Sequence, residues 1–149
     1  LQLAVMTARI ASGGKKIVPS ILPIKEQKEF VKMKEYSKYL NLIQKAMFNV
    51  VNEKKGTANK SKSLKFEFSG KTGTSQVKRI SISDRESDDF RKKDIKWKNR
   101  DHALFVGYMP SQNPKYAISV IVEHGGSGAS VAAPLAKDIF SFINKLSTS

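Results

Sequence analysis

The first signal in the chain is a repeat of apolar residues every three or four positions, which marks one face of a helix. Residues 1–11 have this spacing, and Gly13-Gly14 follow as a stop. Residues 39–51 have it again, with Gly56 just beyond and Lys54-Lys55 where a helix C-terminus favours cations. We therefore expect two packed helices in this part of the chain.

The pattern then changes to the two-residue period of a strand. In residues 64–69, Phe66 and Phe68 alternate with polar side chains, and the segment leads directly into the sequence G-K-T-G-T at 70–74. This favours a half-buried strand over 64–69, with the glycines at its exit or at a sheet edge.

Two further β-rich runs occupy residues 103–109 and 116–123. The sequence P-S-Q-N-P at 110–114 is a strong turn signal, so these runs are expected to form an antiparallel hairpin. Residues 78–101 carry mixed charge and few apolar side chains, which indicates a long exposed loop between strands.

A last helix is expected after the sequence G-G-S-G at 125–128. Ser130 is placed to cap it, and Pro134 falls in its opening turn, where a missing N–H is tolerated. Its expected apolar face consists of Leu135, Ile139, Phe142, Ile143 and Leu146. The order helix, helix, three strands, helix predicts one α+β domain in which helices cover one face of an antiparallel sheet.

Composition narrows the range of functions. With 149 residues and 40% hydrophobic content, the chain suits one domain with a core. The absence of cysteine excludes a disulfide framework, a cysteine nucleophile and a cysteine metal site. The formal net charge of +14 leaves one alternative open, a non-enzymatic basic module that binds nucleic acid or another polyanion. Because the lysines are spread over several segments, a solvated surface is favoured over that module.

The sharpest local motif is K-T-G-T-S at 71–75, next to an apolar strand. At a strand edge, Lys71 would supply positive charge, hydroxyl groups would hold a carboxylate, and Gly73 would leave room for a substrate backbone. The K-T-G triad occurs in class A β-lactamases and penicillin-binding proteins.

The surroundings of this triad extend the likeness. L-Q-L-A-V-M-T-A-R-I-A-S-G-G at 1–14, M-F-N-V-V-N leading to G-T-A over 47–58, and G-K-T-G-T-S-Q-V at 70–77 occur in this order, and the match continues at 102–110 and 117–134. The chain closely resembles the class B penicillin-binding proteins, and E-H-G-G at 123–126 is most similar to the elongation-type members. The resemblance implies that residues 1–149 are the C-terminal portion of a D,D-transpeptidase domain, with part of the penicillin-binding or serine β-lactamase-like fold.

The resemblance also implies a chemistry. Such enzymes cross-link peptidoglycan stem peptides and are acylated by β-lactams, which mimic the terminal D-Ala-D-Ala. By position, Lys71 would face the serine of an S-x-N motif, while Thr72, Gly73 and Thr74 would bind the donor, with the Thr74 N–H in the oxyanion hole. Strict alternation puts Lys71 opposite Thr72 and Thr74, so a shared cleft requires twist or an exposed edge. No cofactor is implied.

We expect the nucleophile to be missing from this chain. Ser12 begins an S-x-x-K match, but it sits at the glycine stop of a helix, and Ser75 begins another within the K-T-G strand, where residues three apart point to opposite faces. Ser111 begins an S-x-N match, but in the hairpin turn and after K-T-G. The chain is therefore expected to supply the K-T-G wall of the cleft without turnover of its own.

The remaining expectations concern metals, location and partners. His102 and His124 have no partner at metal-ligand spacing, so we expect no metal site. The resemblance implies a longer protein that is anchored in the bacterial inner membrane, with this region in the periplasm, and that works with a membrane glycosyltransferase of the elongation machinery. We see no anchor or signal in these residues and expect no nucleic-acid partner. Exposed apolar surface predicts that the piece self-associates.

Overall fold

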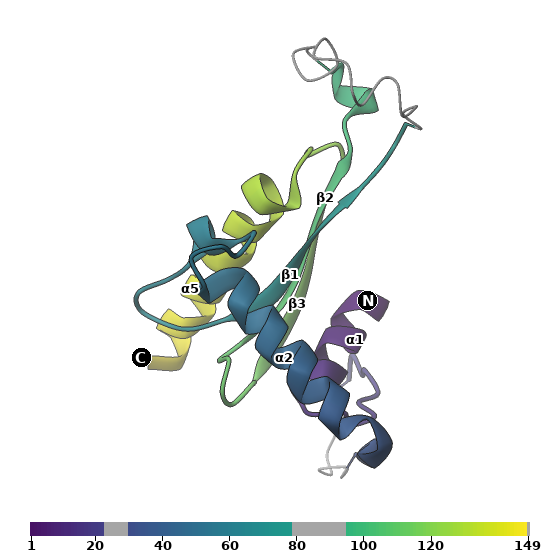
Figure 1. The fold of residues 1–149 in the computed structure, drawn as a ribbon, viewed down its shortest axis with the longest axis vertical. Coiled ribbons are helices and arrows are strands. Elements are labelled where there is room, and N and C mark those ends of the chain that lie inside the picture. Colours follow the sequence, from purple (N-terminus) through teal and green to yellow (C-terminus); the bar gives the residue numbers. More distant parts are fainter. Residues whose placement is uncertain (23–29, 79–94, 149) are drawn as a thin grey trace.

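A computed structural model describes residues 1–22, 30–78 and 95–148 (Figure 1). The longer elements are α1 (Gln2–Ala11), α2 (Ser37–Asn52), β1 (Ser69–Ser75), β2 (His102–Met109), β3 (Tyr116–Val122) and α5 (Ala133–Thr148). Single turns occur at η1 (Lys34–Tyr36), η2 (Asn59–Ser61), η3 (Trp97–Asn99) and the π-helical η4 (Gly128–Ala132). The predicted order of two helices, three strands and a helix is confirmed.

The three strands form one antiparallel sheet in the order β1-β2-β3. Ser69 lies opposite Tyr108 at one end of the β1–β2 pair, and Ser75 lies opposite His102 at the other. β3 pairs over its whole length with residues 103–109 of β2, so the predicted hairpin is confirmed. β1 is an edge strand of the sheet formed by the described residues.

The first predicted strand was placed too early in the sequence. Residues 64–68 are not part of the ladder, which begins at Ser69 and carries K-T-G inside the strand. The register explains this, because β2 ends at Met109 and the following Pro110 has no amide hydrogen to offer to a longer ladder. The alternation itself is real, since Phe68 is fully buried and Glu67 is exposed.

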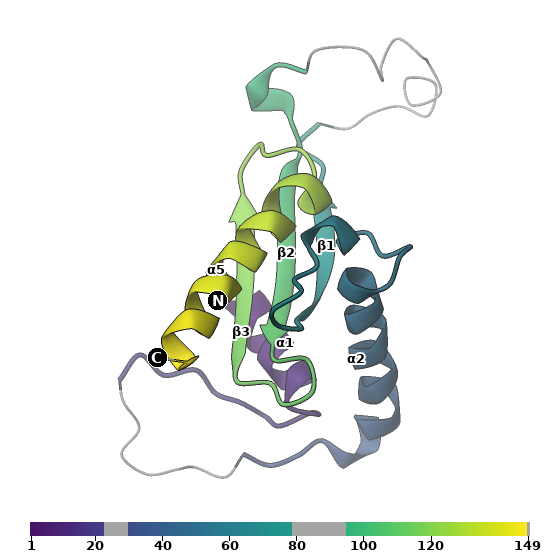
Figure 2. The same cartoon turned by 90° about the vertical axis from the view of Figure 1, so that its left-hand side faces the viewer.

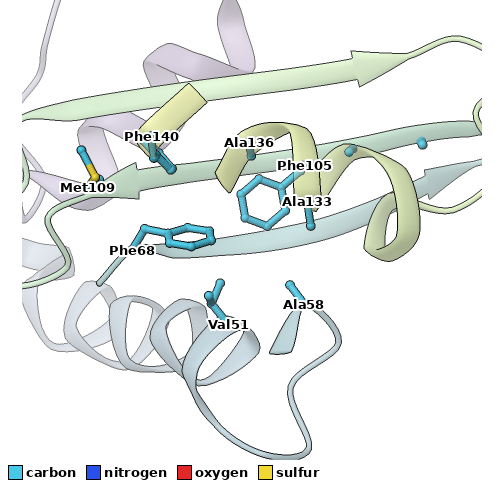
Figure 3. Close-up of a cluster of buried hydrophobic side chains, with 10 residues drawn as sticks. Val51, Ala58, Phe68, Phe105, Met109, Ala133, Ala136 and Phe140 are labelled. Atoms are coloured by element: carbon cyan, nitrogen blue, oxygen red, sulfur yellow. The ribbon is translucent and has the colours of Figure 1, made fainter. Parts of the chain in front are cut away.

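α5 covers one face of the sheet, over the main core (Figure 2). The Phe68 ring packs against those of Phe105 and Phe140, with centroid separations of 6.2 and 5.4 Å (Figure 3). Ala133 and Ala136 are fully buried, because small side chains let the helix lie close to the strands. The other fully or almost fully buried residues of this cluster are Val51, Ala58, Ala103, Met109 and Ala132.

α1 packs on the opposite face of the sheet (Figure 2). There Tyr108 is buried against Ala11 of α1 and Met47 of α2. The expectation that helices cover a single face is therefore wrong. β2 is apolar at alternate positions on both sides, with Phe105 on one and Val106 on the other, so both faces need cover.

Two expectations for the last helix also need correction. The helical run begins at Gly128 after Ser127, and Ser130 lies exposed inside the π turn without acting as the cap, while Pro134 does fall in the opening turn of α5. The face of α5 toward the sheet consists of Ala133, Ala136, Phe140 and Ile143. Leu135, Ile139, Phe142 and Leu146, which were expected there, are 43–65% exposed. α5 thus has two apolar stripes, and periodicity does not say which one is covered.

The end of α1 and the segment before β2 bear on two further expectations. α1 ends at Ala11, and Gly13 and Gly14 follow it at positive φ, so the predicted glycine stop is confirmed. Of the predicted charged loop at 78–101, the segment 79–94 lies outside the described residues, and most of the rest is exposed. In the parts of the chain that the structure describes, none of the helices has the length and hydropathy that a bilayer crossing demands.

Replacing Phe68 with alanine is expected to destabilise the chain by about 3–5 kcal/mol, because a fully buried ring would be lost from the centre of the core. Urea unfolding followed by circular dichroism measures this change. Leu64→Ala, at a side chain that is 98% exposed, is the matched control and should change the free energy of unfolding by less than about 0.5 kcal/mol. Equal losses in the two variants would contradict the assigned core.

Tyr108 makes the free energy of unfolding depend on pH in the alkaline range. Burial raises the pKa of its hydroxyl above the ordinary 10.0, and a hydrogen bond with Ser69 partly opposes this. Between the unfolded and the folded pKa, the unfolded chain releases a proton that the folded chain retains, so stability falls as the pH rises above about 10. The free energy of unfolding from pH 9 to 11 should fall less steeply in Tyr108→Phe than in the unmodified chain. Equal slopes in the two proteins would contradict this role of Tyr108.

Candidate active site

The K-T-G residues lie in β1, along an edge of the described sheet. Thr72 is opposite Phe105, on the face that packs under α5, and alternation places Thr74 on the same face. Lys71 is opposite Val106, on the face that α1 covers. The expected separation of Lys71 from the two threonines is therefore present, and the strand edge is the place where the two faces meet.

The Lys71 side chain turns back onto its own strand. Its Nζ donates a hydrogen bond to the Thr72 carbonyl oxygen at 2.6 Å, and the residue is exposed. A flexible four-carbon stem allows this reach although the Cβ points to the α1 face. The ammonium group thus lies beside the residue whose hydroxyl belongs to the other face, which brings a cation and a hydroxyl close to one edge.

α2 and the segment after it lie beside the outer edge of β1 (Figure 2). The Asn52 side-chain amide donates to the carbonyl oxygens of Phe48 and Phe68, each at 3.0 Å, and so links the end of α2 to the entry of β1. Further along, the hydroxyl oxygens of Thr57 and Thr72 lie 2.9 Å apart in a hydrogen bond. The edge of the K-T-G strand is therefore held from outside the sheet by polar contacts.

The π turn η4 sets the position of β1 on the α5 face. A Cβ on Gly128 would overlap the carbonyl oxygens of Gly73 and Leu104 and would lie 2.9 Å from the Gly73 nitrogen. The turn therefore rests directly on the backbone of the K-T-G glycine, and only a residue without a side chain permits this approach. Single π turns of this kind are frequent at functional sites.

The three serines with chance motif matches are placed where the sequence predicted. Ser12 caps the end of α1 and donates its hydroxyl to the Arg9 carbonyl at 3.1 Å. Ser75 is the exposed last residue of β1. Ser111, in the hairpin turn, accepts a hydrogen bond from the Ser69 hydroxyl at 2.9 Å. The described contacts give none of the three a lysine partner.

The two histidines lie at strand ends, next to each other. The backbone N–H of His124 donates to Nδ1 of His102 at 2.9 Å, and their rings are 4.8 Å apart. His124 donates from its own Nδ1 to the Arg100 carbonyl, because a carbonyl oxygen only accepts. Trp97 packs against His124 at 4.5 Å. No group of three or more metal-ligating side chains gathers within the described ranges.

Sequence reasoning missed Asn52, Thr57 and Gly128 as contributors to this site. All three lie in segments that carry the family likeness. Their contacts with β1 join residues far apart in the sequence, so their spacing from K-T-G does not reveal them. A signal was present in the G-T-A sequence at 56–58, a short segment of small residues that follows α2 and is part of the family likeness.

Comparison with known proteins decides the family. The model of the family described as "Penicillin binding protein transpeptidase domain" matches residues 1–141. The chain belongs to this family. The peptidoglycan D,D-transpeptidase MrdA of Acinetobacter baumannii is 34% identical over 152 residues, which cover 95% of this chain and 22% of that protein. MrdA of Haemophilus influenzae is 37% identical over 99 residues, covering 66% of this chain and 15% of that protein. The chain thus spans less than a quarter of these transpeptidases.

Solved penicillin-binding protein structures agree on the fold. The complex between penicillin-binding protein 2 (PBP2) and MreC from Helicobacter pylori matches with a TM-score of 0.78 and 28% identity, over 100% of this chain and 25% of that one. PBP2 of Pseudomonas aeruginosa in complex with WCK 5153 matches with a TM-score of 0.62 and 31% identity, over 93% of this chain and 28% of that one. The resemblance to elongation-type penicillin-binding proteins and the α+β transpeptidase fold are both confirmed.

Gly128→Ala is expected to loosen the K-T-G strand, because the added methyl group would push η4 off the Gly73 backbone. Overpacking of this kind costs about 1–3 kcal/mol, so the amides of Gly73 and Thr74 should exchange with solvent deuterium about tenfold faster or more. Hydrogen exchange resolved by residue measures this. Ser130→Ala, at an exposed position of the same turn, should leave those amides unchanged. Unchanged exchange in Gly128→Ala would contradict the contact.

Proposed function

We propose that this chain forms the K-T-G side of the active site in a serine-type peptidoglycan D,D-transpeptidase of the PBP2 class. The observation that carries the proposal is the edge placement of K-T-G, where Lys71 Nζ and the Thr72 hydroxyl approach one strand edge from opposite faces. Membership of the transpeptidase family and the likeness to MrdA proteins support it.

The reaction is a two-step acyl transfer. A serine hydroxyl attacks the carbonyl of the D-Ala-D-Ala bond, its proton passes to a base, and the terminal D-Ala leaves as the protonated amine. An amine of a second stem peptide then attacks the acyl-enzyme and releases the serine. The Thr74 N–H stabilises the oxyanion in each step, and the charge of Lys71 lowers the cost of the negative charge that develops nearby.

The donor is recognised by its terminal carboxylate. Thr72 and Thr74 share one face of β1 and offer hydroxyl groups to that anion, and Gly73 leaves the strand edge open to the substrate backbone. β-Lactams present a carboxylate and a reactive carbonyl in the same relation, so they acylate the same serine. Peptidoglycan stem peptides and β-lactams are therefore the proposed ligands, and no cofactor takes part in this chemistry.

The nucleophile lies outside these residues in this proposal. Ser12, Ser75 and Ser111 are engaged in a helix cap, a strand end and a turn, and none has the lysine that S-x-x-K chemistry requires beside it. The chain thus contributes one wall of a cleft, and the serine wall comes from the rest of the transpeptidase domain.

Location and partners follow from the same assignment. We place this region in the periplasm, in a protein anchored in the bacterial inner membrane that works with the membrane glycosyltransferase of the elongation machinery. The complex of PBP2 with MreC from Helicobacter pylori supports an assembly of this kind. In isolation the exposed stripe Leu135, Ile139, Phe142 and Leu146 on α5 supports self-association of the chain.

The test is the intact mass after incubation with benzylpenicillin. The transpeptidase domain that contains this segment should gain one covalent adduct, and the 149-residue chain should gain none. Lys71→Ala in that domain should slow acylation by about 10²–10⁴-fold, the range for a lost group that assists proton transfer or charge stabilisation. Lys65→Ala, at an exposed lysine before β1, should react at the unmodified rate.

Each other outcome rejects a separate part of the proposal. Acylation of the 149-residue chain alone would place the nucleophile among Ser12, Ser75 or another residue of this chain. A domain that does not react would reject the transpeptidase function. Equal rates for the Lys71 and Lys65 variants would remove Lys71 from the site.

A further inference from the structure

The Thr57–Thr72 contact is a hydrogen bond between two hydroxyl groups, from segments 15 residues apart. Thr57 is exposed and Thr72 is half-buried, so the pair lies where a ligand at the strand edge has access to it. Neither residue needs this bond for burial, since water is available to both. Its position beside the K-T-G motif therefore points to a role in the site.

The backbone holds Thr57 at this point. Directly before it, Gly56 packs against the end of α2 so closely that a Cβ would overlap the carbonyl oxygens of Asn49 and Val50. Directly after it, Ala58 is almost fully buried and donates its N–H to the Val50 carbonyl at 2.9 Å. Thr57 is thus the exposed residue between two fixed neighbours, and its hydroxyl is directed at β1 instead of sampling a free loop.

Counting protons assigns the direction of the bond. A hydroxyl group carries one hydrogen and two acceptor lone pairs. If the Thr72 hydroxyl holds a carboxylate, it must donate its single hydrogen to that anion, because a carboxylate only accepts. The Thr72 oxygen can then take part in the contact with Thr57 solely as the acceptor, and Thr57 must be the donor.

We propose that Thr57 is a positioning residue for carboxylate recognition, and that its hydroxyl donates to Thr72 Oγ1 and thereby directs the Thr72 hydrogen toward the substrate or β-lactam carboxylate. The proposal rests on the proposed function. Donation from Thr57 also polarises the Thr72 hydroxyl, since hydrogen bonds in a chain strengthen one another. Lys71, bonded to the Thr72 carbonyl, supplies charge to the same residue from the other face.

The experiment compares two probes on the same protein, the transpeptidase domain that contains this segment. Benzylpenicillin carries the free carboxylate, and its methyl ester lacks the anion but keeps the reactive ring. Thr57→Val removes the hydroxyl at constant shape and should lower the second-order acylation rate for benzylpenicillin about tenfold. The rate for the methyl ester should change by less than about twofold, because no anion depends on the oriented hydrogen.

Four variants serve as references. Thr57→Ser retains the hydroxyl and should restore the ratio of acid to ester rates to within about twofold. Thr72→Val should lower the ratio by itself, and adding Thr57→Val to it should have no further effect, because both changes remove one interaction. Ser147→Ala disrupts the other exposed hydroxyl pair, with Tyr116 at 3.3 Å, and should leave both rates unchanged.

Because the ratio is taken on one sample, a partly unfolded variant lowers both rates and leaves the ratio intact. An equal loss for acid and ester would show a structural role only and would overturn the proposal, as would independent effects of the Thr57 and Thr72 changes. The unmodified domain and its Lys71→Ala variant distinguish a failure of the proposed function from a failure of this inference. If the unmodified domain does not react with benzylpenicillin, the proposed function fails; if the domain reacts and Lys71→Ala slows acylation while Thr57→Val leaves the ratio unchanged, this inference alone fails.

Discussion

The packing of Phe68 against Phe105 and Phe140 is the interaction on which the rest of the structure depends. It anchors the residue just before β1, and because side chains alternate along a strand, it decides which face each K-T-G residue takes. A slip of one residue would exchange Lys71 with Thr72 and would place a charged stem under α5. The aromatic contact is thus a determinant of register as well as of stability.

Within the described residues, three segments contact the K-T-G strand and hold it in place. Gly128 of the π turn packs directly on the Gly73 backbone. The Asn52 side chain links the end of α2 to the residue before β1, and the Thr57 hydroxyl bonds to Thr72 at the strand edge. None of these contacts involves a charged pair. Among the described residues, the hydrogen-bond partner of the Lys71 ammonium group is the neutral Thr72 carbonyl oxygen and no carboxylate, so the strand edge is held by close backbone packing and neutral hydrogen bonds.

The sequence predicted the helices, the hairpin and the K-T-G motif because each depends on local pattern or local chemistry. It misplaced the start of β1, since pairing is decided by where Pro110 ends the partner strand. It assigned the wrong stripe of α5 to the sheet, because both stripes are apolar and the covered one is chosen by the size of Ala133 and Ala136. The Thr57–Thr72 bond was not predictable, because a contact between two polar residues of different segments leaves no periodic trace.

Ala133 and Ala136, on the face of α5 toward the sheet, have a consequence for natural variation. The π turn and α5 form one continuous helical run. The distance between α5 and the sheet, which Ala133 and Ala136 keep short, therefore also affects the contact between Gly128 and the Gly73 backbone. A larger side chain at either alanine would move the helix away from the sheet and weaken the Gly128–Gly73 contact, although neither alanine belongs to the K-T-G motif. Under the proposed function, substitutions in the hydrophobic interior therefore have a structural route to altered acylation by β-lactams, and a comparison of the K-T-G residues alone would overlook it.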